Sequence, residues 1–463
     1  MRPPFSGFKI DGGDAVRTLR QRCGVSLPWE SPLWDRVVLR GNGVITAAHS
    51  GLLEIMGMEW VGSAAPIKAF PREPRLHPFQ EIAVGRLMSR AQGYLVAPTG
   101  AGKTVMALAI IARLRQRGII LTPTKQIAEQ TVKACEKFLG VKAGRVYGGK
   151  DEREAPVAVA TYQTVMRWEK PAKNWGVVAL DECHHISAPV FIRSLCTIHA
   201  HYRYGMTATL DRQDELRLLF PLLLGPHIVR VSPRDAEEIL AGTEIWMLEY
   251  PNSGVPPWQF CEEVCGRIEF CGLKPENCER FRKGIYQFVL QALVEDDVRN
   301  GLIVDAVMKL LKQHEYVLVL TARVKHARWL GQLLMLNTDA PVFVAVGQKA
   351  GWRKEVEAFR REGGVLVATE SLLGEGTDFP EVSAMVLATP AGGRVRVRQR
   401  LGRILRGMRS GRKVVVDVMD AGWARRWAWA RLNTYRRMKK EGFNLRIKRI
   451  KSGWDYKVLE GGL

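Results

Sequence analysis

The segment that most constrains this chain is a glycine-containing loop at residues 97–104, with the sequence APTGAGKT. The residues before it, 94–96, are apolar and suit a buried strand, and residues 105–112 are rich in helix formers. A strand, a glycine loop and a helix in this order bring backbone N–H groups and the positive end of a helix dipole around one point. The sequence therefore predicts a nucleoside triphosphate site.

Each position of this loop has an expected role. Lys103 is expected to reach the β- and γ-phosphates, and the hydroxyl of Thr104 is expected to ligate Mg²⁺. The alternative is a chance glycine turn after a strand, so the rest of the chain has to support the nucleotide interpretation. The other residues expected to surround the phosphates are Pro98, Thr99, Gly100, Ala101 and Gly102.

The charge of the chain indicates a polyanionic partner. The 463 residues carry a formal net charge of +22 at neutral pH, and the pI is about 9.8. Neutralisation of phosphates by Lys and Arg supplies much of non-specific nucleic-acid binding, so nucleic acid is the first expectation and a merely soluble basic protein is the alternative. Neither a run of eighteen apolar residues nor a signal-peptide core is found, which predicts a cytoplasmic protein with no membrane partner.

An acidic pair follows a second apolar run. Residues 177–180 suit a buried strand, and Asp181 and Glu182 come directly after it. Asp181 can hold Mg²⁺ through water, and Glu182 can orient and deprotonate the attacking water. The alternative is a pair of acids that caps the following helix. The position of the pair, 78 residues after Lys103 with further strand-like runs between them, favours catalysis.

The alternation of short apolar runs and helical segments predicts an α/β fold with parallel sheets. Apolar runs at residues 118–121, 157–160 and 177–180 each end in polar residues. Ligand groups of such sheets gather at the carboxyl ends of the strands, where these polar residues lie. Gln80 begins a helix 23 residues before Lys103, and its paired donor and acceptor suit the edge of an adenine.

Six segments in order resemble the motifs of superfamily 2 helicases. In the first half they are residues 97–104, 181–184 and 205–209, and in the second half residues 321–323, 369–380 and 399–406. The continuation at residues 210–215 is similar to the group that contains restriction-enzyme motor subunits, the repair helicase XPB and phage UvsW-like helicases. The resemblance implies two tandem RecA-like P-loop domains that use ATP and Mg²⁺ and grip a nucleic-acid strand. A P-loop kinase would not need the second set of motifs.

The resemblance also implies roles for residues of the second half. Arg403 and Arg406 lie three apart on an expected helix and suit a γ-phosphate, with Gln399 beside them; a solvated basic helix is the alternative. Gly376 and Asp378 are expected to contribute to nucleotide binding. The residues expected to contact the nucleic-acid backbone are Pro123, Thr124, Thr161, Gln163, Thr321, Arg323, Thr369 and Ser371.

Four cysteines, Cys261, Cys265, Cys271 and Cys278, form a cluster with the spacing Cys-x3-Cys-x5-Cys-x6-Cys. Such a cluster can bind Zn²⁺, hold an iron–sulfur cluster or remain unligated, and its spacing does not decide between these three states. It lies in the segment 235–300, which we interpret as an insertion or linker.

We expect a small accessory domain at 1–70, a first lobe at 71–234, a second lobe at 301–421 and a basic aromatic tail at 422–463. In the tail, Trp423, Trp427 and Tyr435 stand at helical spacing. Packing of this aromatic stripe on the second lobe is preferred over base stacking on nucleic acid.

The combined prediction is an ATP-dependent DNA helicase that unwinds or remodels single-stranded, forked or branched DNA, with a role in DNA repair or recombination. The choice of DNA follows from the resemblance of residues 207–215 to the DNA-directed group. A double-strand DNA translocase or an RNA remodeller is the alternative, and a non-enzymatic nucleic-acid-binding scaffold is a third possibility. Polarity, protein partners and oligomeric state do not follow from the sequence.

Overall fold

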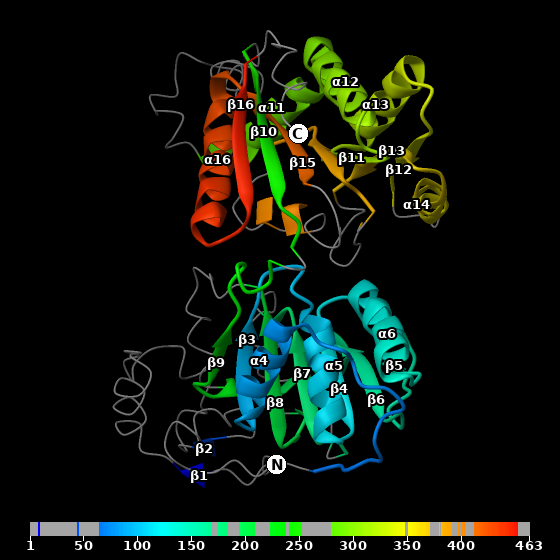
Figure 1. Ribbon diagram of the computed structural model, residues 1–463, viewed down its shortest axis with the longest axis vertical. Helices are drawn as coiled ribbons and strands as arrows, with labels where there is room; N and C mark the ends of the chain where they lie inside the picture. Colours follow the sequence, from blue (N-terminus) through cyan, green and yellow to red (C-terminus); the bar gives the residue numbers. More distant parts are fainter. Residues whose placement is uncertain are drawn as a thin grey trace. The chain divides into compact units, whose positions relative to one another are not determined.

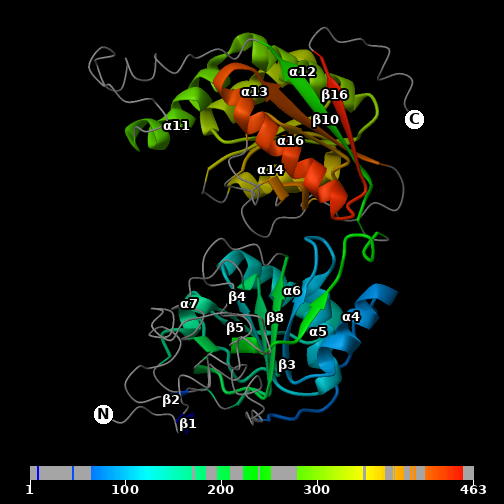
Figure 2. The same cartoon turned by 90° about the vertical axis from the view of Figure 1, so that its left-hand side faces the viewer.

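The computed structural model contains two compact units, residues Met1–Ala236 and Glu237–Leu463, which are taken separately below (Figure 1 and Figure 2). The residues that the structure describes are 8–9, 44–45, 64–168, 172, 174–183, 194–195, 197–208, 223–237, 240–251, 279–347, 351–370, 379, 381–390, 397–398, 400–402 and 412–451.

The first unit is built on a seven-stranded sheet in which every pairing is parallel. From one edge to the other the strands are β5 (Gly144–Val146), β6 (Val157–Thr161), β4 (Gly118–Thr122), β7 (Val177–Asp181), β8 (Tyr202–Thr207), β3 (Gln92–Val96) and β9 (Ile228–Arg230). The helices are α4 (Pro78–Met88), α5 (Lys103–Leu114), α6 (Lys125–Leu139) and the short α7 (Tyr162–Val165). A separate two-residue pairing joins β1 (Phe8–Lys9) to β2 (Val44–Ile45).

The second unit has its own seven-stranded parallel sheet. Its order is β12 (Val342–Ala345), β13 (Gly364–Thr369), β11 (Tyr316–Thr321), β14 (Ala384–Leu387), β15 (Lys413–Asp420), β10 (Thr243–Tyr250) and β16 (Leu445–Ile450). The longer helices are α11 (Glu279–Glu295), α12 (Asp297–Leu311), α13 (Val324–Asn337), α14 (Gly351–Glu362) and α16 (Arg425–Lys440), and a 3₁₀ turn, η5, covers Gly422–Ala424.

The central strands are buried along their whole length because both faces of each sheet are covered, and they are mainly apolar, with Lys413, Asp417 and Asp420 as the charged residues of β15. Every residue of β4, β6 and β7 is buried, and so is every residue of β13 and β15. Continuous apolar runs of this kind are typical of parallel strands between two helical layers. Two α/β domains with parallel sheets were predicted, and the structure confirms them.

Two segments that we interpreted from the sequence as a linker and a tail contribute helices and strands to the second unit. β10 lies in the range 235–300 that we interpreted as an insertion or linker, yet it pairs with β15 and β16 inside the second sheet. α16 and β16 lie in the predicted tail, and both belong to the body of the second unit. The preferred packing of the tail aromatics is confirmed for Trp427 and Tyr435: Trp427 packs against a cluster that includes Ile285, and Tyr435 is fully buried.

In the part of the chain that the structure describes, no helix is both long and apolar enough to cross a membrane.

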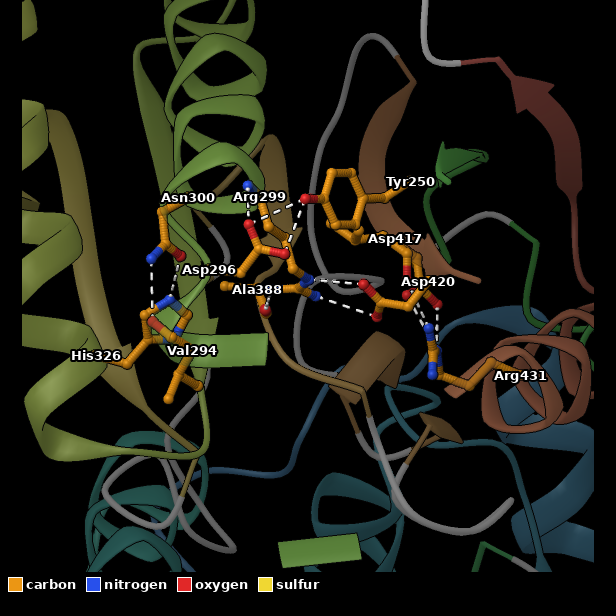
Figure 3. A network of polar contacts seen from close by, with 11 residues as sticks. Tyr250, Val294, Asp296, Arg299, Asn300, His326, Ala388, Asp417, Asp420 and Arg431 are labelled. Atoms are coloured by element: carbon orange, nitrogen blue, oxygen red, sulfur yellow. Dashed lines mark hydrogen bonds and ion pairs between the residues drawn. The ribbon is translucent and has the colours of Figure 1, made fainter. Parts of the chain in front are cut away.

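A buried polar network ties the second unit together (Figure 3). Arg299 on α12 donates to both carboxylate oxygens of Asp420, at 2.6 and 3.2 Å, and to the carbonyl of Ala388 at 2.7 Å. Arg431 on α16 donates to Asp417 and to the carbonyl of Val418 at 2.7 Å. These arginines connect helices to the carboxyl end of β15, so each is a structural cation with its charge already matched.

His326 forms a second branch of this network. Asn300 Nδ2 donates to the carbonyl of Val294, which leaves Asn300 Oδ1 to accept from His326 Nε2 at 2.8 Å. Nδ1 of His326 therefore accepts from the hydroxyl of Thr321 at 2.7 Å. Burial, followed by the charge of Arg299, lowers the pKa of His326 to about 3, so the imidazole is neutral at pH 7 and has a single N–H to donate.

The pKa of His326 predicts an acid-dependent stability. In the unfolded chain His326 takes up a proton near pH 6.5, whereas in the folded unit it stays neutral down to about pH 3. The contribution of His326 to the free energy of unfolding is therefore fully present above pH 6.5, and it falls by up to about 1.4 kcal/mol for each pH unit below that. Urea unfolding of the full chain between pH 7.5 and 4.5 should show a shallower pH dependence for His326→Gln than for wild type. Equal pH dependence in both proteins would contradict this assignment.

Candidate nucleotide-binding site

The predicted phosphate loop connects β3 to α5 and has the backbone that such a loop needs. Gly100 and Gly102 have φ angles of 96° and 81°, in the left-handed region that glycine adopts without steric cost. The loop is fixed to the neighbouring strand because Ala97 N donates to the carbonyl of Thr207 on β8 at 3.0 Å. α5 begins at Lys103, so the first N–H groups of this helix lie at the end of the loop. This backbone has the geometry that phosphate oxygens require.

Gln80 lies against this loop. Its Nε2 donates to the carbonyl of Ala101 at 2.9 Å, and its Oε1 accepts from His77 N at 3.0 Å, so one amide both supports the loop and caps α4. A Cβ atom at position 102 would come within 2.4 Å of Gln80 Nε2 and would be strained at φ 81°, so another residue here would displace the Gln80 amide from the loop. The sequence suggested only a contact of Gln80 with adenine. That contact stays a prediction, and the support of the loop is a function that sequence reasoning missed.

Lys103 points back over the loop that precedes it. Its side chain is only 6 % exposed, Nζ donates to the carbonyl of Ala97 at 3.4 Å, and Nζ lies 3.6 Å from Glu182 Oε1. Residues 79 positions apart in the sequence are thus joined at the same edge of the sheet. The ammonium group of Lys103 is buried and has the carboxylate of Glu182 as its neighbour. A triphosphate that binds at the loop would replace this carboxylate as the anionic partner of Lys103.

The acidic pair is held at the end of β7. Asp181 is the last residue of this strand, and its carbonyl accepts from the hydroxyl of Tyr162 at 3.0 Å. Asp181 Oδ1 accepts from the backbone N–H of Glu182 at 3.0 Å. Glu182 has a φ angle of 46°, which is uncommon for a residue with a side chain. The backbone turns sharply here and directs Glu182 towards Lys103.

These residues fit ATP with Mg²⁺. Thr104 offers a hydroxyl oxygen at the start of α5, and Asp181 offers a carboxylate oxygen, and hard oxygen donors are what Mg²⁺ takes. Pro98, Thr99 and Ala101 complete the loop beside the two glycines, and Ala101 N donates to the carbonyl of Pro98 at 3.0 Å. The structure therefore brings the predicted nucleotide residues of the first half together.

The nucleic-acid residues predicted in the first unit lie at the carboxyl ends of two neighbouring strands. Pro123 and Thr124 follow β4, where Thr124 caps α6 by accepting from Ile127 N at 3.3 Å. Thr161 ends β6, is buried and bonds the hydroxyl of Thr164 at 2.9 Å, whereas Gln163 beyond it is exposed. Of these residues, Gln163 presents the most accessible side chain.

In the second unit, the predicted contacts gather at the carboxyl edge of its sheet. Thr321 and Thr369 end the paired strands β11 and β13, and both are buried, with the Thr321 hydroxyl bonded to His326. The hydroxyl of Thr321 therefore serves the interior of the unit. Arg323 is half-buried, and its guanidinium donates to Gln287 Oε1 at 2.5 Å.

An ion pair that sequence reasoning missed joins two motif segments of the second unit. Arg400 is buried, its guanidinium pairs with Glu370, and it also donates to the carbonyl of Thr389 at 3.3 Å. Glu370 directly follows Thr369, and Arg400 precedes Arg403 and Arg406 by three and six residues. The only available signal was this spacing of three residues between successive arginines.

Several predicted residues lie outside the described part of the chain. They are Gln399, Arg403, Arg406, Gly376, Asp378, Ser371 and the four cysteines Cys261, Cys265, Cys271 and Cys278. Among the residues that are described, no group of three or more His, Cys, Asp or Glu side chains could hold a metal ion.

Comparison with known protein families gives two matches. Residues 73–212 match the family model "Type III restriction enzyme, res subunit", and residues 302–408 match "Helicase conserved C-terminal domain". The two matches together cover more than half of the chain and include all six motif segments. They fall on the two sheets described above, one on each unit.

Individual relatives agree with these matches. The chain is 24% identical over 393 residues to "DNA 3'-5' translocase XPB2" of Sulfurisphaera tokodaii, covering 80% of this chain and 87% of the relative. It is 35% identical over 160 residues to "Putative DNA 3'-5' helicase Rad25" of Halobacterium salinarum, covering 33% of this chain and only 26% of that relative.

Among solved structures, the DNA-bound Type ISP restriction-modification enzyme LlaBIII superimposes with a TM-score of 0.56 at 14% identity. The match covers 84% of this chain and 32% of that enzyme, and at this identity it supports the fold alone. Together with the loop, the acidic pair and the two parallel sheets, the family matches show that the chain belongs to the superfamily 2 ATP-dependent DNA helicases and translocases, in the group of the restriction-enzyme motors and XPB.

Proposed function

We propose that this chain hydrolyses ATP to move along DNA with 3'-5' polarity and thereby unwinds or remodels forked or branched DNA. The observation that carries the proposal is the position of Lys103 beside Glu182, with Nζ and Oε1 3.6 Å apart at the phosphate loop. The polarity and the choice of DNA are supported by the similarity of this chain to the DNA 3'-5' translocase XPB2 and to the putative DNA 3'-5' helicase Rad25.

The residues of the first unit have separate roles in this proposal. The loop amides and Lys103 bind the phosphates, and a bound Mg²⁺, held by Thr104 and Asp181, would polarise the γ-phosphate. Glu182 accepts the proton of the attacking water, which its pairing with Lys103 and the turn at φ 46° position it to do. Gln80 keeps the loop in place and contacts the adenine edge.

We propose that Arg403 and Arg406 stabilise charge on the transferred phosphoryl group, with Gln399, Gly376 and Asp378 binding nearby parts of the nucleotide. A guanidinium that acts on the transition state contributes about 10³- to 10⁵-fold to kcat. Arg403→Ala should therefore lower kcat of ATP hydrolysis by at least about a hundredfold while ATP still binds. Equilibrium binding of a fluorescent ATP analogue and steady-state ATPase kinetics measure the two quantities. Loss of nucleotide binding with kcat unchanged would contradict this role.

Contacts with the nucleic-acid backbone are proposed for two edges. Pro123, Thr124, Thr161 and Gln163 serve the first unit, and Thr321, Arg323, Thr369 and Ser371 serve the second, with the buried threonines acting through their backbone groups. Backbone contacts carry little sequence information, so DNA sequence should have little effect on activity.

Stimulation of the ATPase by different polymers tests the substrate. Single-stranded DNA, duplex DNA, a fork and RNA are compared at equal nucleotide concentration, and the fork should give the largest kcat together with ATP-dependent strand separation. Duplex stimulation without unwinding would favour the translocase alternative, and stimulation by RNA alone would overturn the choice of DNA.

The four clustered cysteines, Cys261, Cys265, Cys271 and Cys278, are proposed as a zinc site, with an iron–sulfur cluster and free thiols as alternatives. Metal analysis of the purified protein decides between them: one zinc per chain, iron with acid-labile sulfide, or neither.

A further inference from the structure

α16 presents a row of positive charge that the helicase site does not use. Seven of its sixteen residues are Lys or Arg and none is Asp or Glu. The helix lies after residue 408, where the match to the helicase family model ends. It packs against β15 and β16 in the second unit (Figure 1). Its charge therefore needs an explanation apart from the motifs.

The inner face of α16 accounts for its packing and for one of the seven cations. Ala428, Leu432, Tyr435 and Met438 are buried at helical spacing, and Arg431 is buried among them as the partner of Asp417. Tyr435 also donates to Asp417 at 2.7 Å. The other six basic residues are not needed for this packing.

Three of these six form an exposed row without acidic partners. Arg425, Arg436 and Lys440 are exposed and make no ion pair with any residue in the described part of the chain. With 3.6 residues per turn they fall within about 60° of arc, and the row is about 22 Å long. Arg436 and Lys440 stand four residues apart, where like charges on a helix repel each other, and an anionic ligand would remove that cost.

Other nearby cations are excluded from the row because carboxylates already match them. Arg446 and Lys448 on β16 pair with Glu244 at 4.0 and 3.2 Å. Arg449 pairs with Glu249 and lies over the ring of Trp429, 5.5 Å from its centroid, which identifies the face of β16 that α16 covers. Since side chains alternate along a strand, Arg446 and Lys448 lie on the opposite face.

The aromatic residues of this region are used for packing. Trp427 makes an edge contact with Tyr286 at 5.0 Å between ring centroids, and Trp429 is partly covered by Arg449. A single-strand site needs exposed rings on which bases stack. Trp429 lies within the arc of the row, but it is half-buried and covered by Arg449, so the row offers cations and no open ring. Such a row suits instead the regularly spaced phosphates of a duplex.

We infer that the outer face of α16, around Arg425, Arg436 and Lys440, is a second, sequence-independent contact surface for the phosphate backbone of duplex DNA. This inference depends on the proposed function only because it takes DNA as the nucleic acid that the chain binds. The surface needs neither ATP nor the motif residues, and it adds duplex affinity to a motor whose motifs grip the backbone elsewhere.

Binding of a 30-base-pair duplex to the full chain, measured without nucleotide over a range of salt concentrations, tests this surface. The triple variant Arg425→Gln, Arg436→Gln, Lys440→Gln should bind about 10- to 100-fold more weakly at 100 mM salt, and its log–log salt slope should be smaller by about 2 to 3. The matched control is Lys312→Gln, Arg328→Gln, Lys354→Gln, which removes three exposed cations of α12's end, α13 and α14 and should bind like wild type.

The charge-conserving variant Arg425→Lys, Arg436→Lys, Lys440→Arg should bind within about threefold of wild type, which separates charge from folding. Equal losses in the triple variant and the control would overturn the inference, as would a loss confined to single-stranded DNA. Failure of the proposed function is recognised separately, because wild-type ATPase would then not respond to any DNA, whereas failure of the surface leaves that response in place.

Discussion

Replacing Glu182 by glutamine is expected to lower kcat of ATP hydrolysis by about 100- to 10,000-fold while ATP still binds. Glutamine keeps the size of the side chain but cannot accept a proton from water, and it also ends the ion pair with Lys103 at 3.6 Å. Stopped-flow or steady-state ATPase assays give kcat, and filter binding gives the affinity for ATP. Because Lys103 loses a carboxylate neighbour that competes with phosphate, affinity for ATP should be unchanged or higher.

Glu154→Gln is the matched control, since Glu154 belongs to the same unit and is highly exposed. It should leave both constants unchanged. If Glu182→Gln hydrolysed ATP at the wild-type rate, Glu182 would have no part in activating water, and its left-handed backbone at φ 46° would need another explanation.

Replacing Asp420 by alanine is expected to destabilise the second unit by about 3–5 kcal/mol, because Arg299 would be left as a buried charge without its partner. The two side chains are 0 % and 1 % exposed, and their closest atoms are 2.6 Å apart. Urea unfolding of the full chain measures the loss. The comparison is Glu362→Ala, which removes an exposed partner of Arg361 and should cost less than about 1 kcal/mol.

A double replacement separates the cost of the lone charge from the net value of the pair. Arg299→Met with Asp420→Leu removes both charges and should recover most of the stability lost in Asp420→Ala, since buried pairs replaced by apolar side chains are often near neutral. If the double variant were as unstable as the single one, the network as a whole, including the bond from Arg299 to the carbonyl of Ala388, would carry the stability.

The sequence was sufficient for the parts of the fold that follow from local patterns. Apolar runs such as β4 and β7, each ending in polar residues, predicted the parallel sheet of the first unit, and the loop at residues 97–104 predicted the helix that begins at Lys103. The proximity of Lys103 and Glu182 was predictable as well, because both follow strands of one parallel sheet.

The sequence was insufficient where a residue's environment depends on distant contacts. Thr321 was predicted as a nucleic-acid contact from its place after a strand, but its hydroxyl is buried against His326, a partner set by the packing of α13. β16 contains three Lys or Arg among six residues and was interpreted as tail, since nothing local shows that Glu244 and Glu249 on β10 would match its charges. Gln80 likewise acquires its bond to Ala101 only when α4 packs beside the loop.

The most direct test of the central claim is ATP-driven movement along DNA by wild type and by Lys103→Ala, measured as displacement of a triplex-forming strand from duplex DNA. Wild type should displace the strand only with hydrolysable ATP, with a directional bias towards the 5' end of the tracked strand. Lys103→Ala should bind DNA normally yet show no displacement, because its phosphate loop lacks the charge that holds the triphosphate. Displacement by Lys103→Ala at the wild-type rate, or by wild type without ATP, would contradict the account.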